Sequence, residues 1–460
     1  MEQENPGDKL NRIVKLALDD GSASSLAEAE KIYQSYRLVI IVGEKVKKSP
    51  TLQAAALTAI NIARRSMLGG VEVYGNIDFE LLVPWRKFTI FKQAVFDLGG
   101  KPVMDLDPIA PKIIIGLSKK ATFPGEFVVR ATFDGWIGGV VPVADRVQLA
   151  ESQEFVPAGV LAGALGVSEA FQYLRKTNPY AGERAVGLSL WQPGREESWL
   201  EINERGPQVT RMPSSLWLIG LGHLGQAFLW ILGLLPYANP QEVNLVLQDF
   251  DTLVPANDST SLLTRPELIG LKKTRAMAAW CEERGFRTVI QERRFSSNFQ
   301  VYHEEPQVAI CGVDNSEARA ALEEVGFKRI IEAGLGTGTK EYLAFQLHSF
   351  PSSIRAKERW GGRVEVKNTD FIRTNPAYQV LAAEGMDECG LTLLAGRSVG
   401  ASFVGVTTAT LIIAELLRMI EGKTQFEVID GSLNSLNNLI SVENSIRTEA
   451  INPGFTLACK

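Results

Sequence analysis

An apolar strand that runs into a glycine-rich turn and then an apolar helix is the feature of this sequence that most constrains its fold. Residues 216–235 read LWLIGLGHLGQAFLWILGLL and place Gly220, Gly222 and Gly225 in the spacing Gly-x-Gly-x-x-Gly. Glycines in such a turn let backbone N–H groups approach a phosphate, and the following helix N-terminus carries partial positive charge. The stretch predicts a nucleotide site in a doubly wound α/β fold, although the motif alone does not choose the nucleotide.

The chain also contains a faint internal repeat. Residues 155–171 (FVPAGVLAGALGVSEAF) align with residues 401–417 (ASFVGVTTATLIIAELL). Upstream apolar segments correspond in the same order, 38–44 with 215–222 and 111–120 with 307–316. Each half reads as strand, helix, strand, later strand and terminal helix, which is the pattern of a doubly wound parallel sheet. A chain of 460 residues is also long enough for two cores, so we predict two Rossmann-like α/β domains in tandem.

The two predicted domains, residues 1–197 and 198–460, differ in their chemistry. The first strand of the N-terminal half ends in Gly-Glu-Lys at residues 43–45, with no phosphate-binding glycines. Its later strand reaches Ser118 at the place where the second half has Asp314. We therefore expect the N-terminal half to be degenerate and to bind no nucleotide.

Polar residues after the glycine loop indicate which nucleotide is bound. Asp249 and Asp251 follow the next predicted strand, where Asp249 is placed to bind ribose hydroxyls. Lys273 opens a later helix, and its mobile charge can stabilise a leaving pyrophosphate. Asp314 follows the strand VAICGV, at an edge where its carboxylate can hold Mg²⁺ together with phosphate oxygens. These residues favour nucleotidyl transfer from Mg-ATP, because hydride transfer needs neither the lysine nor the metal.

Composition excludes several other classes of protein. The formal net charge is −5, whereas a nucleic-acid surface leaves a basic excess. The four cysteines form no Cys-x-x-Cys pair and the three histidines lie far apart, so we expect no zinc. The longest apolar run, residues 402–420, is interrupted by threonines and Glu415, which favours a buried helix over a membrane span. We expect a cytoplasmic protein with no nucleic-acid or membrane partner.

The segments GLGHLG, DFDTL with AND, GLKK and VDNSEAR, in this order and spacing, resemble the ThiF/MoeB superfamily, which includes the ubiquitin-activating enzymes. The resemblance covers residues 213–422 and is carried by several motifs jointly. Its members adenylate the C-terminal glycine of a ubiquitin-like protein. It implies that Asp249 binds ribose and that Asn257 binds the phosphates. It also implies that Lys273 contacts the β- and γ-phosphates and that Asp314 holds Mg²⁺.

Two departures from the superfamily pattern narrow this resemblance. Most relatives carry an Arg-Gln pair shortly after the asparagine, and here that position falls near Thr260, so either part of the phosphate clamp is missing or the charge comes from elsewhere, such as Arg265. The paired Cys-x-x-Cys motifs of the structural zinc are also absent. Both features are similar to the activating enzymes of bacterial ubiquitin-like conjugation operons in antiphage defence, the BilD-like type. The resemblance implies a monomeric pseudo-dimer, and it makes Arg12 a candidate for the arginine that relatives supply to ATP in trans.

Cys389 stands in the acidic context Asp-Glu-Cys, within a predicted crossover segment at residues 380–400. In the autophagy-type activating enzymes and their bacterial relatives, the thioester cysteine lies at a comparable place. The resemblance implies that the Cys389 thiolate attacks an acyl-adenylate and releases AMP. A helix N-terminus or Arg397 would lower the pKa of the thiol. The implied partners are a ubiquitin-like protein that ends in glycine and a conjugating enzyme.

Two other functions stay open at this point. The chain could adenylate a substrate for sulfur transfer or peptide modification without acylation of Cys389. It could also be an NAD-dependent oxidoreductase that uses the same loop. Among the remaining residues, we expect Arg64 and Arg65 to end a helix, where cations suit the helix dipole. Residues 423–460 have no assignable role, and NSLNNLISVENSI within them fits one more helix or a docking segment.

Overall fold

The two halves of the molecule contain β-sheets of the same strand order. The computed structural model describes residues 8–85, 87–117, 123–362, 369–446 and 454–459. The first sheet has the order β3-β2-β1-β4-β5-β6-β7, and the second has the order β11-β10-β9-β12-β13-β14-β15-β16. In each sheet the strands are parallel as far as β5 or β13, and antiparallel strands follow. The prediction of two doubly wound α/β domains in tandem is therefore confirmed.

The strands and helices have the following bounds. The first sheet contains β1 (Arg37–Val42), β2 (Gly70–Tyr74), β3 (Gly100–Val103), β4 (Lys112–Ile115), β5 (Val128–Asp134), β6 (Ile137–Pro142) and β7 (Val186–Ser189). The second contains β9 (Ser215–Ile219), β10 (Asn244–Gln248), β11 (Arg287–Gln291), β12 (Val308–Cys311), β13 (Arg329–Leu335), β14 (Ala344–Phe350), β15 (Phe426–Ser432) and β16 (Ile440–Glu443). A separate pair is formed by β8 (Arg211–Pro213) and β17 (Phe455–Leu457). The helices of the first half are α1 (Arg12–Asp19), α2 (Leu26–Gln34), α3 (Pro50–Ser66), α4 (Phe91–Asp97) and α5 (Val156–Arg175). Those of the second half are α6 (His223–Leu234), α7 (Lys273–Glu283), α8 (Ser316–Ala320), α9 (Gly338–Glu341), α10 (Ala356–Trp360), α11 (Thr369–Thr374), α12 (Pro376–Ala383), α13 (Glu388–Gly396) and α14 (Ser402–Ile420).

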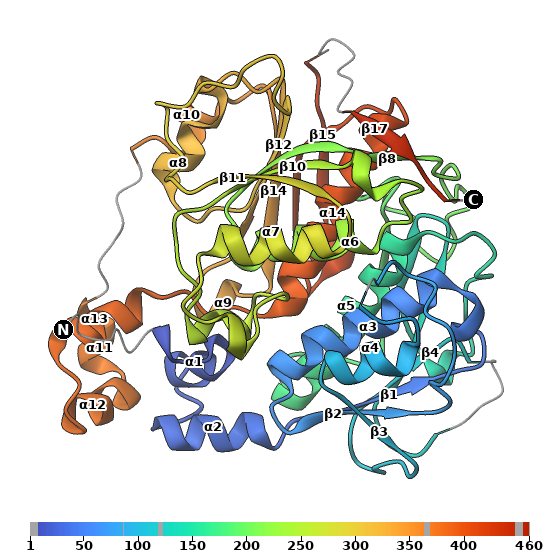
Figure 1. Ribbon diagram of the computed structural model, residues 1–460. Coiled ribbons are helices and arrows are strands. Elements are labelled where there is room, and N and C mark those ends of the chain that lie inside the picture. Colours follow the sequence, from blue (N-terminus) through green and yellow to red (C-terminus); the bar gives the residue numbers. More distant parts are fainter. Residues whose placement is uncertain (1–7, 86, 118–122, 363–368, 447–453, 460) are drawn as a thin grey trace.

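The two halves share one hydrophobic core. Helices α3 and α5 of the first half pack together, and α5 also packs on α14, which in turn packs on α6. Figure 1 shows these helices where the two halves meet. The Trp230 indole N–H donates across the boundary to the Thr58 hydroxyl at 3.0 Å, and the Trp230 ring contacts Trp85 edge to face. Because the buried apolar residues of both halves form one cluster, the halves pack as parts of one body.

Small residues allow the repeated helices to pack closely, as their alignment predicts. On α5, a Cβ at Gly159 would stand 2.0 Å from the Thr51 carbonyl oxygen of α3. On α14, a Cβ at Gly405 would stand 2.2 Å from the Nε2 atom of His223, the first residue of α6. Helix α14 is long and apolar enough to cross a membrane, yet 94% of its apolar window is buried in this core. The expectation of a buried helix there is confirmed.

Helices α11, α12 and α13 form a small lobe that was not expected from the sequence. Figure 1 shows it in orange beside α1. Its own apolar cluster includes Tyr378 and is packed against Leu10 of the N-terminal segment. The Asn375 amide donates to the Leu18 carbonyl at 2.9 Å, and the Tyr378 hydroxyl donates to Asp19 at 2.9 Å. The N-terminal helix therefore holds this lobe in place.

The C-terminal region completes both sheets of the second half rather than adding a helix. The stretch that fitted a helix or a docking segment contains β16, which pairs antiparallel with β15. The last described residues form β17 beside β8. Alternation of apolar and polar residues in ISVE, typical of a half-exposed strand, accounts for this difference. Ser118, which served in the comparison of the two halves, lies outside the described residues.

Candidate functional site

The glycine loop joins β9 to α6, and the conformation of the loop requires glycine at two of its three glycine positions. Gly220 has φ of +87°, a left-handed conformation that glycine adopts without steric cost. A Cβ at Gly225 would stand 2.0 Å from the Gly220 carbonyl oxygen. Gly222, the N-cap of α6, differs because a Cβ there would meet nothing within 4 Å. The loop thus leaves open space at the N-terminus of α6, where the helix dipole favours an anion.

Asp249 ties this loop to the carboxyl end of β10. Its Oδ2 atom accepts the N–H of Leu221 at 2.7 Å, and its Oδ1 atom accepts the N–H of Asp251 at 2.8 Å. The residue is 9% exposed. Asp249 therefore follows β10 and borders the glycine loop, and its binding of a ribose stays a prediction.

Lys273, the first residue of α7, lies between two carboxylates at the same edge. Its Nζ atom is 2.7 Å from Asp251 Oδ2 and 3.9 Å from Asp249 Oδ2. The lysine is 8% exposed, whereas the Asp251 side chain is 48% exposed. A nearly buried ammonium group held by carboxylates can exchange them for phosphate oxygens, which offer the same kind of acceptor.

Asn257 lies in a short 3₁₀ helix, Pro255–Ser259, that follows β10. Its Oδ1 atom accepts the N–H of Val254 at 2.9 Å and so fixes the turn. The side-chain NH₂ group is the part of this residue that can donate to a phosphate. Ser259 in the same turn accepts the backbone N–H of Arg12 at 3.1 Å, so the turn also contacts the N-terminal helix.

Asp314 lies beyond the end of β12 and is exposed. Its neighbour Val313 lies against the glycine loop, since a Cβ at Gly220 would stand 2.8 Å from the Val313 side chain. Within the described residues, no group of three or more histidine, cysteine, aspartate or glutamate side chains could hold a metal ion. A metal at Asp314 would therefore depend on oxygens of its ligand as well as on this carboxylate.

Arg12 brings a buried positive charge to the same region. Burial and the nearby Arg397 lower the pKa of Arg12 to about 10, against the opposing effects of Asp8 and Asp314. Its Nη1 atom is buried without a hydrogen-bond partner among the described residues. A buried guanidinium group with unused donors is suited to an anionic ligand.

His223, inside the glycine loop, is neutral near pH 7. Burial lowers the pKa of its imidazole to about 4. Its Nε2 atom has no hydrogen-bond partner in the described part of the chain and lies against Gly405 of α14. The residue therefore packs the loop onto the helix that follows the α11–α13 lobe.

Cys389 is the second residue of α13, and its side chain lies outside the described part of the structure. The helix begins with an N-cap at Asp387, which accepts the N–H of Gly390 at 2.7 Å. Arg397, the expected neighbour of the thiol, forms an ion pair with Asp8 at 2.7 Å. The other cysteines with described side chains are Cys281 and Cys311, which are buried, and Cys459, which is exposed. Burial raises the pKa of the Cys311 thiol to about 12, consistent with a packing role.

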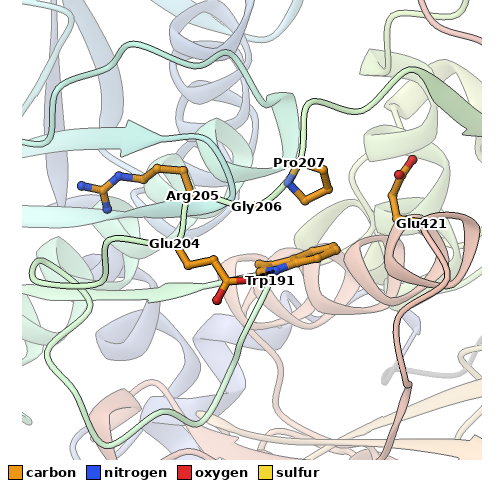
Figure 2. Close-up of a pocket in the computed structure, with 6 residues that line it drawn as sticks. All are labelled: Trp191, Glu204, Arg205, Gly206, Pro207 and Glu421. Atoms are coloured by element: carbon orange, nitrogen blue, oxygen red, sulfur yellow. Dashed lines mark hydrogen bonds between the residues drawn. The ribbon is translucent and has the colours of Figure 1, made fainter.

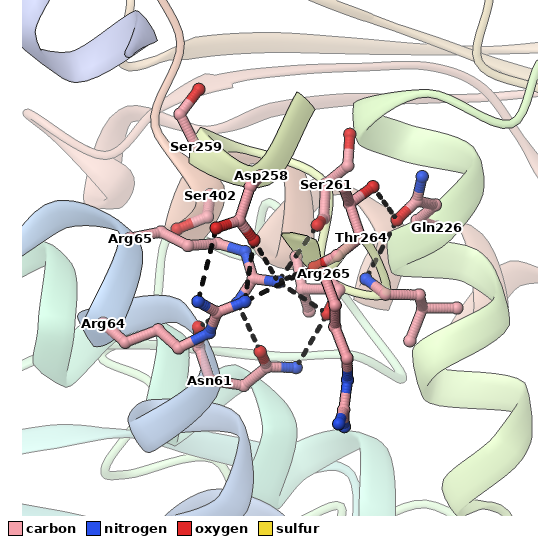
Figure 3. A network of polar contacts seen from close by, with 12 residues as sticks. Asn61, Arg64, Arg65, Gln226, Asp258, Ser259, Ser261, Thr264, Arg265 and Ser402 are labelled. Carbon is pink, nitrogen blue, oxygen red and sulfur yellow. Dashed lines mark hydrogen bonds and ion pairs between the residues drawn. The ribbon is translucent and has the colours of Figure 1, made fainter. Parts of the chain in front are cut away.

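The structure changes the roles expected for three arginines. Arg265 does not supply charge to the glycine loop, because its guanidinium group pairs with Asp97 of the first half, with Nη1 and Oδ1 at 2.9 Å. Arg64 and Arg65 do more than end α3, because both reach into the second half. These contacts, shown in Figure 3, link sites about two hundred positions apart in the chain.

Gln226 of α6 was also missed by the sequence analysis. Its amide donates to the Leu221 carbonyl of the glycine loop at 3.1 Å. Its oxygen accepts the N–H of Leu263 at 2.9 Å and the hydroxyl of Thr264 at 3.1 Å. A single glutamine in an otherwise apolar helix is the signal that could have revealed this contact between the loop and the segment after Asn257.

At the corresponding edge of the first sheet, apolar side chains fill the turn, and the Glu154 carboxylate accepts the N–H of Thr51 at the start of α3 at 3.0 Å. Gly43 and Gly116, at the ends of β1 and β4, approach one another as Gly220 and Gly312 do in the second half. Val46 and Leu52 lie against Gly116. The first half thus keeps the tight turn without the glycine loop, which explains why we expect it to bind no nucleotide.

Figure 2 shows a separate pocket of about 330 Å³ near the end of α14. It is lined by Trp191, Glu204, Arg205, Gly206, Pro207 and Glu421. None of the residues predicted to bind nucleotide contributes to this pocket.

Each half of the chain matches a protein-family model, and nearly the whole chain matches one known protein. Residues 37–190 match the family model described as the BilD N-terminal domain, and residues 212–423 match the BilD C-terminal domain. The bacterial E1-like protein BilD of Collimonas sp. (strain OK412) is 44% identical over 430 residues, which cover 94% of this chain and 92% of that protein.

Solved structures show only a loose similarity. The crystal structure of E. coli MccB with MccA-N7isoASN is 12% identical, with a TM-score of 0.34, and the match covers 69% of this chain and 95% of that one. The E. coli tRNA N6-threonylcarbamoyladenosine dehydratase TcdA is 13% identical, with a TM-score of 0.29, and the match covers 45% of this chain and 86% of that one. At these scores neither structure adds to the functional argument.

The tandem fold, with a glycine loop in one half and none in the other, together with these matches, defines an E1-like protein built from two doubly wound α/β domains. Within that class, the chain belongs to the BilD family of bacterial E1-like proteins.

Proposed function

We propose that this protein adenylates the C-terminal glycine of a ubiquitin-like protein with Mg-ATP and then carries that protein as a thioester on Cys389. The observation that supports the proposal most directly is the convergence of the glycine loop, Asp249 and Lys273 at one edge of the second sheet. The E1-like family of the chain agrees with it. The edge of the first sheet, where Val46 and Leu52 fill the turn, fits an inactive half, so that one chain would supply both halves of a pseudo-dimer.

The residues at this edge fit ATP. The open space at Gly222 leaves room for a phosphate at the N-terminus of α6. Asp249 would bind the ribose, and Asn257 would donate to the phosphates. Lys273 would leave Asp251 to meet the β- and γ-phosphates. The unpaired Nη1 atom of Arg12 would supply a further donor.

Asp314 fits Mg²⁺ because it is an exposed carboxylate at the carboxyl edge of the sheet, and Mg²⁺ is often held by one carboxylate together with phosphate oxygens. The metal, when bound, neutralises charge on the phosphates. No zinc is part of the proposal.

In the first reaction step, an oxygen of the partner's terminal carboxylate attacks the α-phosphorus of ATP. A carboxylate–phosphorus bond forms, and the bond from this phosphorus to the oxygen bridging the α- and β-phosphates breaks. Pyrophosphate leaves with the electron pair of that bond, and Lys273 neutralises part of its charge. The carboxylate is ionised near pH 7, so no proton transfer is needed.

In the second step, the Cys389 thiolate attacks the carbonyl carbon of the acyl-adenylate. A carbon–sulfur bond forms, the carbon–oxygen bond to the phosphate breaks, and AMP leaves with the electron pair. The thiol gives its proton to solvent beforehand, and the position of Cys389 in the first turn of α13 favours its thiolate. A conjugating enzyme would then accept the ubiquitin-like protein, in the cytoplasm and in an antiphage defence system.

The test is a non-reducing gel of this protein with Mg-ATP and the ubiquitin-like protein encoded beside it, together with pyrophosphate exchange. We expect an ATP-dependent, thiol-sensitive adduct that chelation of Mg²⁺ abolishes and that Cys389→Ala lacks. Cys459→Ala is the matched control, because Cys459 is exposed and should not alter the adduct. Exchange without an adduct would favour adenylation for sulfur transfer or peptide modification. Absence of exchange with any glycine-ended partner would contradict the proposal.

A further inference from the structure

The segment that follows Asn257 in the second half is held by the first half of the molecule. Residues 258–265 occupy the place where superfamily relatives carry their phosphate-binding arginine, yet here this segment directs no arginine to the glycine loop. Its own Arg265 points away to Asp97. Two arginines at the end of α3, Arg64 and Arg65, reach it from the first half (Figure 3).

Arg65 fixes the backbone of the segment. Its guanidinium group is buried, and its Nη2 atom donates to the carbonyl oxygens of Leu262 at 2.8 Å, Ser261 at 3.1 Å and Thr264 at 3.1 Å. The Nη1 atom donates back to the carbonyl of Asn61 at 2.7 Å, one turn earlier in α3. Three carbonyls of the segment converge on one buried donor group, so a change in the conformation of the segment would break several hydrogen bonds to Arg65 at once.

Arg64 fixes the side chain of Asp258, the residue that follows Asn257. Its Nη2 atom is 2.7 Å from Asp258 Oδ1, and its Nη1 atom is 3.5 Å from Oδ2. Asp258 is directly bonded in sequence to Asn257, so this ion pair holds the turn that presents Asn257. Both side chains are about one-third exposed, so the pair can be altered without opening the core.

The same segment is tied directly to the glycine loop. Gln226 accepts from Leu263 and Thr264 while it donates to the carbonyl of Leu221. A shift of residues 261–264 would therefore be transmitted to the loop through one buried side chain. The contacts run without a break from α3 of the first half, through this segment, to the turn that would hold the phosphates.

We propose that Arg64 and Arg65 are positioning residues for the nucleotide site: they set the conformation of residues 257–264, so that the degenerate half governs ATP binding without touching ATP. The inference rests on the proposed function, because it concerns the same site. It assigns to the first half a role beyond packing.

The inference is tested by the KM for Mg-ATP in pyrophosphate exchange, with the ubiquitin-like partner saturating. We expect Arg64→Gln to raise this KM about fivefold, as loss of a partly exposed ion pair would. Asp258→Asn should raise the KM at least as much, because Asp258 also lies 3.6 Å from Arg65, and the effect of the double variant should be smaller than the product of the two single effects. Arg65→Lys should raise the KM more than tenfold, because one ammonium group cannot replace a guanidinium group that donates to the segment through Nη2 and to Asn61 through Nη1. The KM for the ubiquitin-like protein should not change in any of them.

Arg184→Lys is the matched control. Arg184 also lies in the first half and donates to backbone carbonyls of the second, those of Leu433 and Asn434. These residues follow β15, four strands along the sheet from β9. This variant should lower the thermal midpoint as Arg65→Lys does, and leave the KM for Mg-ATP unchanged.

The outcomes separate this inference from the proposed function. If the variants lower the thermal midpoint and keep the wild-type KM for Mg-ATP, Arg64 and Arg65 have only a structural role and the inference is wrong. A KM for Mg-ATP raised equally by Arg184→Lys would also overturn it. A wild-type protein that shows neither exchange nor a shift of its thermal midpoint with Mg-ATP overturns the proposed function, and this inference with it.

Discussion

The imidazole of His223 lies against the backbone of Gly405, so close that a Cβ at Gly405 would stand 2.2 Å from its Nε2 atom. This contact joins the glycine loop, where α6 begins, to α14, the helix that follows the lobe carrying Cys389. The first half repeats the relationship: Gly159 of α5 approaches Thr51 near the start of α3. A glycine is thus required at the same place in both terminal helices, but only in the second half does it face the nucleotide loop.

Gly405→Ala should weaken Mg-ATP binding at least tenfold, because the new methyl group must displace His223 and the loop with it. Gly159→Ala meets a backbone oxygen in the same way and should lower the thermal midpoint without affecting the nucleotide. The measurement is the change in thermal midpoint caused by Mg-ATP in each variant. His223→Ala combined with Gly405→Ala makes room for the methyl group and should restore part of the binding. Equal responses of Gly405→Ala and Gly159→Ala would show that the contact serves packing alone.

Much of the fold could be predicted from the sequence because its determinants are local and occur twice. Apolar strands and small-residue helices repeat in the same order, and a parallel sheet brings its strand ends to one edge. At this edge Lys273 Nζ lies 3.9 Å from Asp249 Oδ2, although the two residues are twenty-four positions apart.

The rest depends on contacts that leave no local pattern. Arg65 binds carbonyl groups nearly two hundred positions away, and any residue type can supply a carbonyl. The α11–α13 lobe is placed by the N-terminal helix, through pairs such as Asn375 with the Leu18 carbonyl. Neither relationship has a sequence signature. From the sequence alone, Arg65 therefore fits a residue that ends a helix, and its partners in the second half cannot be predicted.

The burial of His223 predicts a loss of stability in mild acid. Burial lowers the pKa of the imidazole from 6.5 to about 4. Between these values the unfolded chain binds a proton that the folded protein does not, so the free energy of unfolding falls as the pH drops from 6.5 toward 4. From pH 7 to pH 5 this group should cost about 2 kcal/mol. In urea unfolding at pH 7 and pH 5, the free energy of unfolding should therefore fall by about 2 kcal/mol less in His223→Gln than in the wild type. An identical loss in both proteins would mean that the imidazole can be protonated in the folded state.

Two glycines of the loop should respond differently to alanine. At Gly225 a Cβ would collide with the Gly220 carbonyl, so Gly225→Ala should lower the thermal midpoint even without nucleotide. At Gly222 a Cβ meets nothing within 4 Å, so Gly222→Ala should lower that midpoint less than Gly225→Ala does. The same methyl group would occupy the space expected for phosphate, so Gly222→Ala should still abolish the stabilisation by Mg-ATP. Normal Mg-ATP binding by Gly222→Ala would place the phosphates elsewhere.

Arg12 should show opposite effects on stability and on nucleotide binding. Burial and Arg397 disfavour its charged form in the folded protein, and its Nη1 atom is buried without a hydrogen-bond partner among the described residues. Arg12→Met keeps most of the apolar stem and removes this charge, so it should raise the thermal midpoint of the nucleotide-free protein. It should also lower pyrophosphate exchange about a hundredfold, because the charge would be needed only when triphosphate is bound. Arg12→Lys should recover part of the exchange, since lysine keeps the charge but lacks the second terminal nitrogen of the guanidinium group. Exchange at the wild-type rate in Arg12→Met would remove Arg12 from the nucleotide site and leave Lys273 as the candidate cation there.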